Sequence, residues 1–260
     1  MLYIFRHIDD GWNPITIAPM KKILLTLAAL SHMIVGAAQE APMQKVIIVA
    51  KRDAEWHSYR HAYKAAAFFD KYTRTRPLIQ AHMQIRPNRT DLSMDGLRIA
   101  LEGESTNMEI AVDRIGRATL PMLKQAYEED AVLRLNRLKG NYHFSGRYSI
   151  RERDDGTYRV ADLRAACEQV LSAQRDSGYR VRLIGKKCMG VRFVFARDAA
   201  AQLDYRDGTK SLPLAVADGQ PFENDTMGVF KVALLRFGDW PEQGTIVTPT
   251  RPIAVGTIYE

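Results

Sequence analysis

The chain has 260 residues, of which 46% are hydrophobic and 26% are charged, with 37 lysine and arginine residues against 30 aspartate and glutamate residues. This composition excludes wholesale disorder, because it supplies enough apolar side chains to build a core. The formal net charge of +7 is compatible with a polyanionic partner, but the basic residues are spread along the chain with acidic residues between them. We therefore interpret the charge as a mildly basic surface and expect no specific nucleic-acid binding.

A short apolar stretch near the N-terminus has the organisation of a secretory signal peptide. Lys21 and Lys22 precede the almost wholly apolar run Ile23–Val35, and the small residues Gly36–Ala38 follow. A basic region, a brief apolar region and small residues at the cleavage site are the three parts of such a signal. The run is shorter than the roughly 20 residues of a membrane-spanning helix. We predict a signal peptide over 20–38 and a periplasmic or secreted protein.

Residues 1–19 fit this signal poorly, because Asp9, Asp10 and Pro14 are unusual ahead of an apolar run. We interpret 1–19 as an upstream extension that results from gene-start assignment, with Met20 as the true start. The alternative to a signal peptide over 20–38 is a buried or interfacial helix that is not cleaved. No second long apolar stretch follows, so no transmembrane span is expected after signal cleavage.

The chain contains two cysteines, Cys167 and Cys188. An even pair of cysteines in an exported protein predicts a disulfide. The bond would close a loop of about 22 residues, for which the chain-entropy treatment gives roughly 3 kcal/mol of stabilisation. The spacing is not that of a C-x-x-C redox motif, and two cysteines alone make a poor zinc site. In a cytosolic protein the same residues would be two reduced, buried thiols.

The first half of the mature chain is predicted to contain a helix followed by a small antiparallel meander. The β-branched run Lys45–Ala50 predicts a strand. Asp53 is a candidate cap for a helix over 54–72, where aromatic and apolar residues recur at three- and four-residue steps. Strands are expected over 81–86 and, from period-two alternation of apolar and polar side chains, over 97–102 and 107–113.

The second half is predicted to contain another helix and further strands. Residues 123–140 fit a helix or a strand equally, and 142–150 reads as an extended segment. A helix is expected over 160–175, with Gly178 just beyond its end as a C-terminal cap. Asp207-Gly208 is a strong hairpin signal. Further strands are expected over 181–184, 191–195, 229–237, 245–247 and 253–258.

Two segments, 113–121 and 206–213, share a turn pattern in which glycine precedes Leu-Pro by four residues. Glycine permits the positive φ of a tight turn, and proline marks the end or edge of a strand. Either an internal duplication or the coincidence of a common turn explains the pattern. We predict two modules with a connecting segment between them: a helix plus β-meander over 40–125, a connection over 126–155, and a disulfide-stapled helix plus β-sandwich-like module over 156–260.

The chain resembles a family of uncharacterised exported proteins of proteobacteria, known as domains of unknown function. The signal segment, the turn VDRIGRATLP at 112–121, the helix start VADLRAAC at 160–167 and Cys188 carry the resemblance. It covers most of 40–215 in layout through short motifs. The resemblance implies an envelope location and a β-rich fold, and it implies no reaction and no catalytic residue.

Histidines are the only metal-ligand candidates that the spacing suggests. His57 and His61 lie four residues apart on the first predicted helix, where both could face one metal ion. The zinc-protease pattern needs a glutamate at position 58, where this chain has Ser58, and no third ligand is evident. We interpret the pair as a polar helix face and keep both histidines as weak metal candidates. His82 and His143 fall in strand-like segments without a partner recognisable from spacing.

Motifs for serine hydrolysis, phosphate loops and dinucleotide binding are absent from the sequence. We therefore assign no catalytic residue and no cofactor. Aromatic residues and arginines interleave over 142–153 and 179–195. This mixture is compatible with stacking on sugars or binding anionic glycans, but on strands it more often marks one core face and one wet face.

These observations predict an α+β fold of antiparallel, β-rich, sandwich-like modules with two flanking helices. We expect a non-enzymatic binding or structural module of the bacterial envelope, with an unknown envelope ligand or protein as partner. The first alternative is a hydrolase that acts on envelope polymers through residues distant in sequence. The second is a polyanion-binding protein, which would need a basic face on one side.

Overall fold

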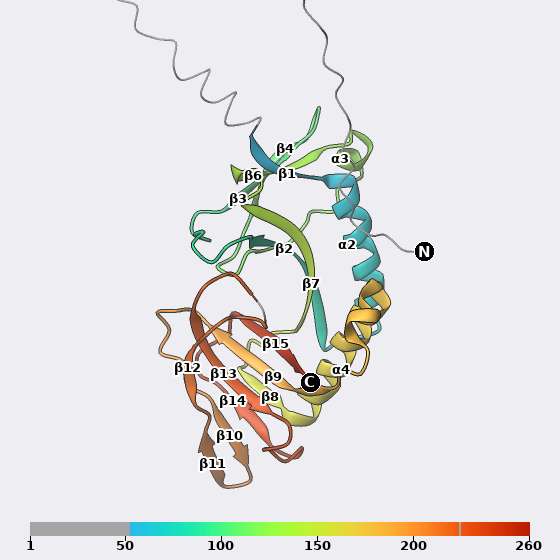
Figure 1. The fold of residues 1–260 in the computed structure, drawn as a ribbon. Coiled ribbons are helices and arrows are strands. Elements are labelled where there is room, and N and C mark those ends of the chain that lie inside the picture. Colours follow the sequence, from blue (N-terminus) through green and yellow to red (C-terminus); the bar gives the residue numbers. More distant parts are fainter. Residues whose placement is uncertain (1–52, 224) are drawn as a thin grey trace, which may run out of the picture. The chain divides into compact units, whose positions relative to one another are not determined.

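The computed structural model describes residues 53–223 and 225–260 (Figure 1). Within these ranges, 15 strands and three α-helices are present, and the strands pair antiparallel. This arrangement confirms the predicted α+β, β-rich and sandwich-like fold class. The extension 1–19, the signal segment 20–38 and the predicted strand Lys45–Ala50 lie outside the described residues.

The first half of the described chain supplies one four-stranded sheet and part of a larger one. Its elements are β1 (Ala54–Ser58), α2 (Tyr59–Thr73), β2 (Ile79–Pro87), β3 (Arg98–Glu102), β4 (Asn107–Ala111), β5 (Arg117–Ala118), α3 (Lys124–Glu128), β6 (Val132–Leu138) and β7 (Tyr142–Ile150). Strands β1, β6, β3 and β4 form the first four-stranded sheet in that order, whereas β7, β2 and β5 form one end of a seven-stranded sheet.

The second half completes the seven-stranded sheet and adds another sheet of four strands. Its elements are β8 (Thr157–Arg159), α4 (Val160–Gln174), two short helical turns (Arg175–Tyr179 and Val181–Leu183), β9 (Cys188–Phe195), β10 (Asp204–Asp207), β11 (Lys210–Pro213), β12 (Val216–Gly219), β13 (Phe230–Arg236), β14 (Thr245–Val247) and β15 (Ala254–Tyr259). The second four-stranded sheet has the order β11-β10-β14-β8, and the seven-stranded sheet has the order β12-β13-β9-β15-β7-β2-β5.

The two halves share one topology. Sheet order β1-β6-β3-β4 corresponds strand by strand to β8-β14-β10-β11, and α2 and α4 both have 15 residues. A matching backbone hydrogen bond starts each helix: the N–H of Tyr59 donates to the carbonyl of Ala131 (3.0 Å), and that of Val160 to the carbonyl of Gly244 (2.9 Å). In the seven-stranded sheet, β7 and β15 are neighbours, and each pairs on its other side with the strand that follows its helix. This correspondence supports an internal duplication.

The Leu-Pro turns do not occupy equivalent places in the two halves. Residues 206–213 form the β10–β11 hairpin, which corresponds to the β3–β4 hairpin. Residues 113–121 instead form the turn after β4 and strand β5. The shared sequence pattern indicates only that each segment contains a tight turn at a glycine and the end of a strand. The topology, and not this pattern, relates the halves.

The predicted start of the first helix is wrong by five residues. The helix begins at Tyr59, where the side chain of Ser58 accepts a hydrogen bond from the backbone N–H of His61 (3.4 Å). Asp53 is therefore not the cap. Residues 54–58 pair with β6 instead and form the edge strand of that sheet, in which only Ala54 is buried.

One further segment differs from its predicted structure, and another, which the sequence left open between helix and strand, contains both. The predicted strand over 181–184 is wrong, because 181–183 is a helical turn. The ambiguous segment 123–140 contains both alternatives in succession, a short helix over 124–128 and a strand over 132–138. Among the described residues, none of the helices is both long and apolar enough to span a bilayer.

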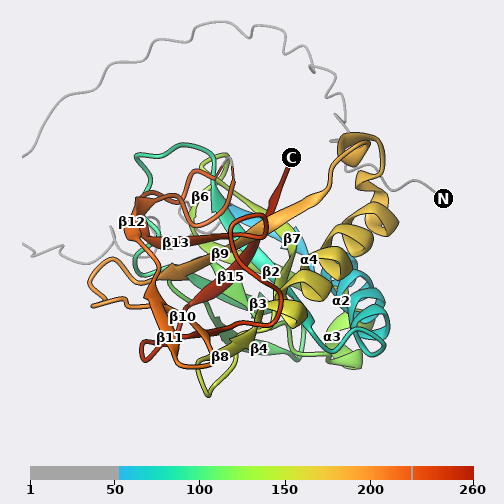
Figure 2. The ribbon, with the colours of Figure 1, turned by 90° about the horizontal axis from the view of Figure 1, so that it is seen from below.

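Both long helices cover sheets from the same side, as Figures 1 and 2 show. Buried Leu163 and Val170 of α4 pack with Phe193 of β9, and Tyr59 of α2 packs with Leu133 of β6 in a second cluster. The strands of the predicted modules and of the connecting segment share the seven-stranded sheet, and all described residues belong to one unit.

The two cysteines form a disulfide between α4 and β9. Cys167 is buried on α4, Cys188 begins β9, and their Cα atoms are 5.9 Å apart. The pairing is the one predicted from the cysteine count. It fastens the middle of α4 to the sheet.

Candidate functional site

One face of the β2–β7 strand pair is polar along its whole length. We call these side chains the polar face: Gln80, His82, Gln84 and Arg86 of β2, opposite Ser149, Arg147, Ser145 and His143 of β7. Residues on the other face of the pair, such as Ile79, Ile85 and Tyr148, enter the cores beneath the helices. The polar face therefore needs partners other than the main cores.

The corresponding face of the second half is largely apolar. There, Val194 of β9 lies opposite Ala254 of β15, and both belong to a small buried cluster with Met227 and Phe230. Because the two halves share a topology, polar side chains are not required by the fold at this place. The polar face is a property of the first half.

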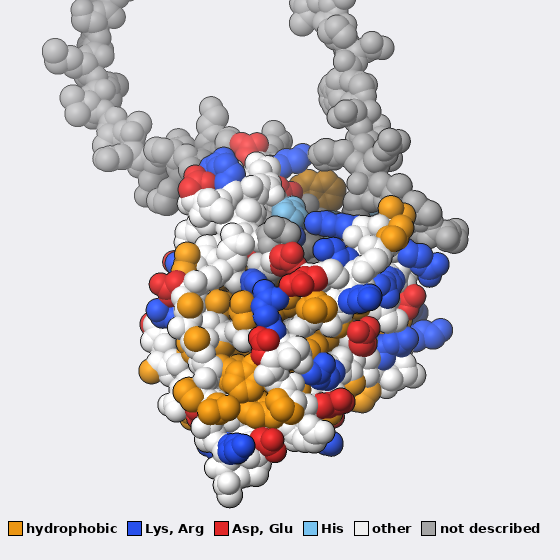
Figure 3. All heavy atoms as spheres, turned by 60° about the horizontal axis from the view of Figure 1, so that its bottom comes forward, with side chains coloured by type: hydrophobic (Ala, Val, Ile, Leu, Met, Phe, Trp, Pro, Cys, Tyr) orange, Lys and Arg blue, Asp and Glu red, His pale blue; other side chains and the backbone are white. Residues whose placement is uncertain are grey.

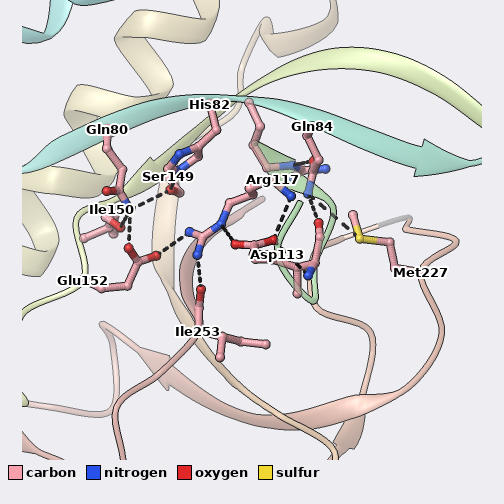
Figure 4. A network of polar contacts seen from close by, with 12 residues as sticks. Gln80, His82, Gln84, Asp113, Arg117, Ser149, Ile150, Glu152, Met227 and Ile253 are labelled. Atoms are coloured by element: carbon pink, nitrogen blue, oxygen red, sulfur yellow. Dashed lines mark hydrogen bonds and ion pairs between the residues drawn. The ribbon is translucent and has the colours of Figure 1, made fainter. Parts of the chain in front are cut away.

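Arg117 joins the polar face to its surroundings (Figure 4). Its guanidinium donates to Asp113 Oδ2 (2.7 Å), to Glu152 Oε1 (2.7 Å) and to the carbonyl of Ile253 (2.6 Å). Burial acts to lower the pKa of Arg117, but the two carboxylates outweigh burial and raise it. Only 14% of the side chain is exposed. The guanidinium is thus a fixed structural cation.

The turn that carries Arg117 requires a glycine. Asp113 Oδ1 accepts hydrogen bonds from the backbone N–H groups of Ile115 (3.0 Å) and Arg117 (2.7 Å). Gly116 has φ of +76°, and a Cβ atom there would collide with the carbonyl oxygen of Ile85. The backbone of the turn can approach β2 so closely only without a side chain at this position.

His82 and Ser149 form a hydrogen-bonded pair on the polar face. Their Nε2 and Oγ atoms are 3.0 Å apart, and Ser149 is 1% exposed. The Gln80 amide links Ser149 to Glu152. Burial, followed by the charge of Arg117 and of other nearby arginines, lowers the pKa of His82 to about 3. The imidazole is therefore neutral at neutral pH.

Asp225 fastens the segment before β13 onto the polar face. Its fully buried carboxylate pairs with Arg147 (3.3 Å) and Arg86 (3.9 Å), and it accepts backbone hydrogen bonds from Thr226 (2.7 Å) and Met227 (3.2 Å). Burial lowers the pKa of Arg147 to about 10, so this arginine stays charged at neutral pH. The pair is a buried ion pair between elements far apart in sequence.

A pocket of about 410 Å³ opens beside the Arg117 contacts. Its lining consists of Asp113, Arg114, Ile115, Arg117, Glu152, Arg251, Pro252 and Ile253. Arg114 pairs with Asp198 (3.1 Å) and Arg251 with Asp154 (2.9 Å), and both arginines are about two-thirds exposed. Exposed ion pairs contribute only ~0–1 kcal/mol. Arg114 and Arg251 can therefore exchange these partners for an anionic group in the pocket, which Arg117 cannot.

The structure separates the two histidines that the sequence placed on one helix. His57 lies on β1 and His61 on α2, with ring centroids 6.3 Å apart. The His57 ring stacks on Phe144 at 5.5 Å, and burial, together with the charge of His61, lowers its pKa. The shared helix face was wrong because the helix starts at Tyr59. In 53–223 and 225–260, no three His, Cys, Asp or Glu side chains gather as metal ligands.

Sequence reasoning missed most of this site. Sequence spacing identifies no hydrogen-bond partner for His82. The alternation of polar residues from Gln80 to Arg86 does indicate a strand with one polar face. The sequence marks the turn around Arg117 as a motif, but it does not indicate that Arg117 forms ion pairs with Asp113 and Glu152. Nothing local marks Asp225, since Arg147 is 78 residues away in the chain.

Comparison of the chain with models of protein families, with curated proteins and with solved structures finds no match. The resemblance to uncharacterised exported proteins stays a prediction.

The low pKa of His82 predicts a specific loss of stability in acid. The folded value is about 3 and the unfolded value about 6.5, so between these pH values the unfolded chain binds a proton that the folded chain does not. Stability therefore falls as pH drops through this window. We expect His82→Gln to lose less unfolding free energy than the native chain from pH 7 to pH 4.5, by about 2.5 kcal/mol.

Urea unfolding at several pH values measures this difference. Thr209→Gln, at an exposed position where neither residue titrates, is the control and should retain the native pH dependence. An unchanged slope in His82→Gln, or a His82 imidazole that titrates near its ordinary pKa in NMR spectra, would contradict the assignment.

Proposed function

We propose that this protein is a non-enzymatic binding module of the bacterial envelope, exported to the periplasm or beyond. One observation carries the proposal. His82 and Ser149, which have catalytic potential, hydrogen-bond to each other inside the protein, whereas the exposed side chains of Arg114 and Arg251 line the pocket. The signal-like segment and the Cys167–Cys188 disulfide support the location, because structural disulfides form in oxidising compartments.

Hydrolysis is less well supported than binding. A serine nucleophile must reach its substrate with a base in hydrogen-bond range. Ser149 is 1% exposed and does not line the pocket. The pocket carboxylates, Asp113 and Glu152, both form ion pairs with Arg117, which holds them in structural contacts inside the protein.

The chemistry of the pocket favours a ligand with an anionic group. Guanidinium groups form paired, directional hydrogen bonds with carboxylates and phosphates. Arg114 and Arg251 carry this capacity at the pocket rim, and their present partners, Asp198 and Asp154, are themselves largely exposed. A carboxylate- or phosphate-bearing component of the envelope fits this arrangement.

The double variant Arg114→Gln/Arg251→Gln tests the pocket. Calorimetric titration with disaccharide-peptide fragments of peptidoglycan and with inorganic phosphate should show binding by the native chain to at least one probe. We expect the variant to bind that probe at least tenfold more weakly, since each charge-assisted hydrogen bond contributes about 1.5–3 kcal/mol. Arg206→Gln, an exposed position outside the pocket, is the control. The proposal fails if the native chain binds neither probe, or if the double variant binds as well as the control.

The location has its own test. The chain is expressed in bacteria from Met20, the cells are fractionated, and the protein is analysed by mass spectrometry with and without thiol alkylation. We expect a periplasmic or secreted product that begins after Ala38, with Cys167 and Cys188 alkylated only after reduction. A cytosolic product with an intact start and two reactive thiols would refute export.

A further inference from the structure

The segment 175–187, between α4 and β9, distinguishes the second half from the first. In the first half, residues 74–78 connect α2 to β2, whereas in the second half 175–187 make the equivalent connection. The longer connection contains two short helical turns, and Gly178, with φ of +99°, breaks the helical backbone inside the first of them. Figure 2 shows it projecting past the end of α4. The shared topology does not need these extra residues.

The tip of this segment presents aliphatic side chains to solvent. Val181 is 82% exposed and Ile184 is 75% exposed, the two highest values among the large hydrophobic side chains described, and Tyr179 is 51% exposed. Leu183 between them is buried and points back into the protein. Because water contact disfavours aliphatic groups, adjacent ones at a protruding tip indicate a partner surface.

Cationic side chains surround these aliphatic groups. Within the segment, Arg175, Arg180, Arg182, Lys186 and Lys187 stand against a single acidic residue, Asp176. Asp176 is already engaged by the Tyr72 hydroxyl (2.7 Å) and by Arg180 (3.9 Å). Figure 3 shows lysine and arginine side chains gathered on the side where the two long helices lie. The tip therefore combines apolar groups with a local excess of positive charge.

Covalent and hydrogen bonds hold the base of the segment. The Arg175 guanidinium donates to the carbonyls of Leu183 (3.4 Å) and Lys186 (2.8 Å). The backbone of Lys187 exchanges two hydrogen bonds with Glu260, and the next residue, Cys188, is in the disulfide. Val181 and Ile184 are thus presented on a fixed base, which lowers the ordering cost of binding.

We propose that segment 175–187 docks the protein onto a bilayer that contains anionic lipids. Val181 and Ile184 enter the boundary between headgroups and acyl chains, and Arg180, Arg182 and Lys186 contact lipid phosphates. Aliphatic residues flanked by lysine and arginine are the combination that interfacial binding uses. Soluble polyanions offer no apolar phase for Val181 and Ile184, whereas a bilayer does. This surface is separate from the pocket and goes beyond the proposed function.

Vesicle flotation tests the docking. The full chain is mixed with vesicles of phosphatidylcholine alone or of phosphatidylcholine with a mole fraction of about 0.3 of phosphatidylglycerol, which gives an anionic surface. We expect binding to the anionic vesicles, weakened by salt. Val181→Ser/Ile184→Ser should bind at least tenfold more weakly with its charge unchanged, and Arg180→Gln/Arg182→Gln should lose its preference for anionic vesicles.

Two controls separate this surface from others. Leu138→Ser/Leu212→Ser alters exposed aliphatic residues elsewhere and should bind vesicles as the native chain does. Arg114→Gln/Arg251→Gln should also bind anionic vesicles as the native chain does. The vesicle experiment can therefore be interpreted even if the native pocket binds neither probe. The proposal is overturned if the native chain ignores anionic vesicles. It is equally overturned if Val181→Ser/Ile184→Ser binds anionic vesicles as well as the native chain does. A third contradicting result is that heparin binds the native chain and Val181→Ser/Ile184→Ser equally, whereas vesicles bind neither.

Discussion

Two arginines on one sheet face, Arg117 and Arg147, impose the constraint on which the rest of this structure depends. Both side chains are largely buried, with 14% and 19% exposure, and a buried charge is costly unless it is paired and hydrogen-bonded. Their carboxylate partners come from three separate places: Asp113 in the turn after β4, Glu152 after β7, and Asp225 before β13. These contacts hold the turn that carries Asp113 and the segment that carries Asp225 against the sheet. The pocket is lined by the turn around Asp113 and by Arg251–Ile253.

The shared topology of the two halves shows which features are additions to the fold. Where the first half has the polar face, the second has the apolar contact of Val194 with Ala254. Where the second half has the projecting segment 175–187, the first has the short connection 74–78. The halves thus bear different surfaces on one framework: arginines at a pocket rim in one, and an aliphatic, cationic tip in the other. Both surfaces suit negatively charged partners of different kinds.

Local patterns in the sequence were sufficient for the β-rich class, the second long helix and the Cys167–Cys188 pair, because periodicity and cysteine number are local signals. They failed at the first helix, since residues 54–58 continue the helical spacing while Ser58 makes the actual cap. The polar face was visible only as alternation. Its meaning depends on Asp225, which reaches Arg147 across 78 residues of chain, and no local pattern encodes such a distance. The correspondence between the two halves likewise resides in strand order and not in matching sequence motifs.

A double-mutant cycle of Arg147→Met and Asp225→Asn, followed by urea unfolding, tests the central constraint most directly. If the buried charges need each other, each single variant loses roughly 3–5 kcal/mol of unfolding free energy, because it leaves the other buried charge without its nearest ionic partner. The double variant then loses less than the sum of the two, by more than about 1.5 kcal/mol. Losses that add to within about 0.5 kcal/mol would show two independent residues, and would contradict the account of a sheet face held together by paired charges.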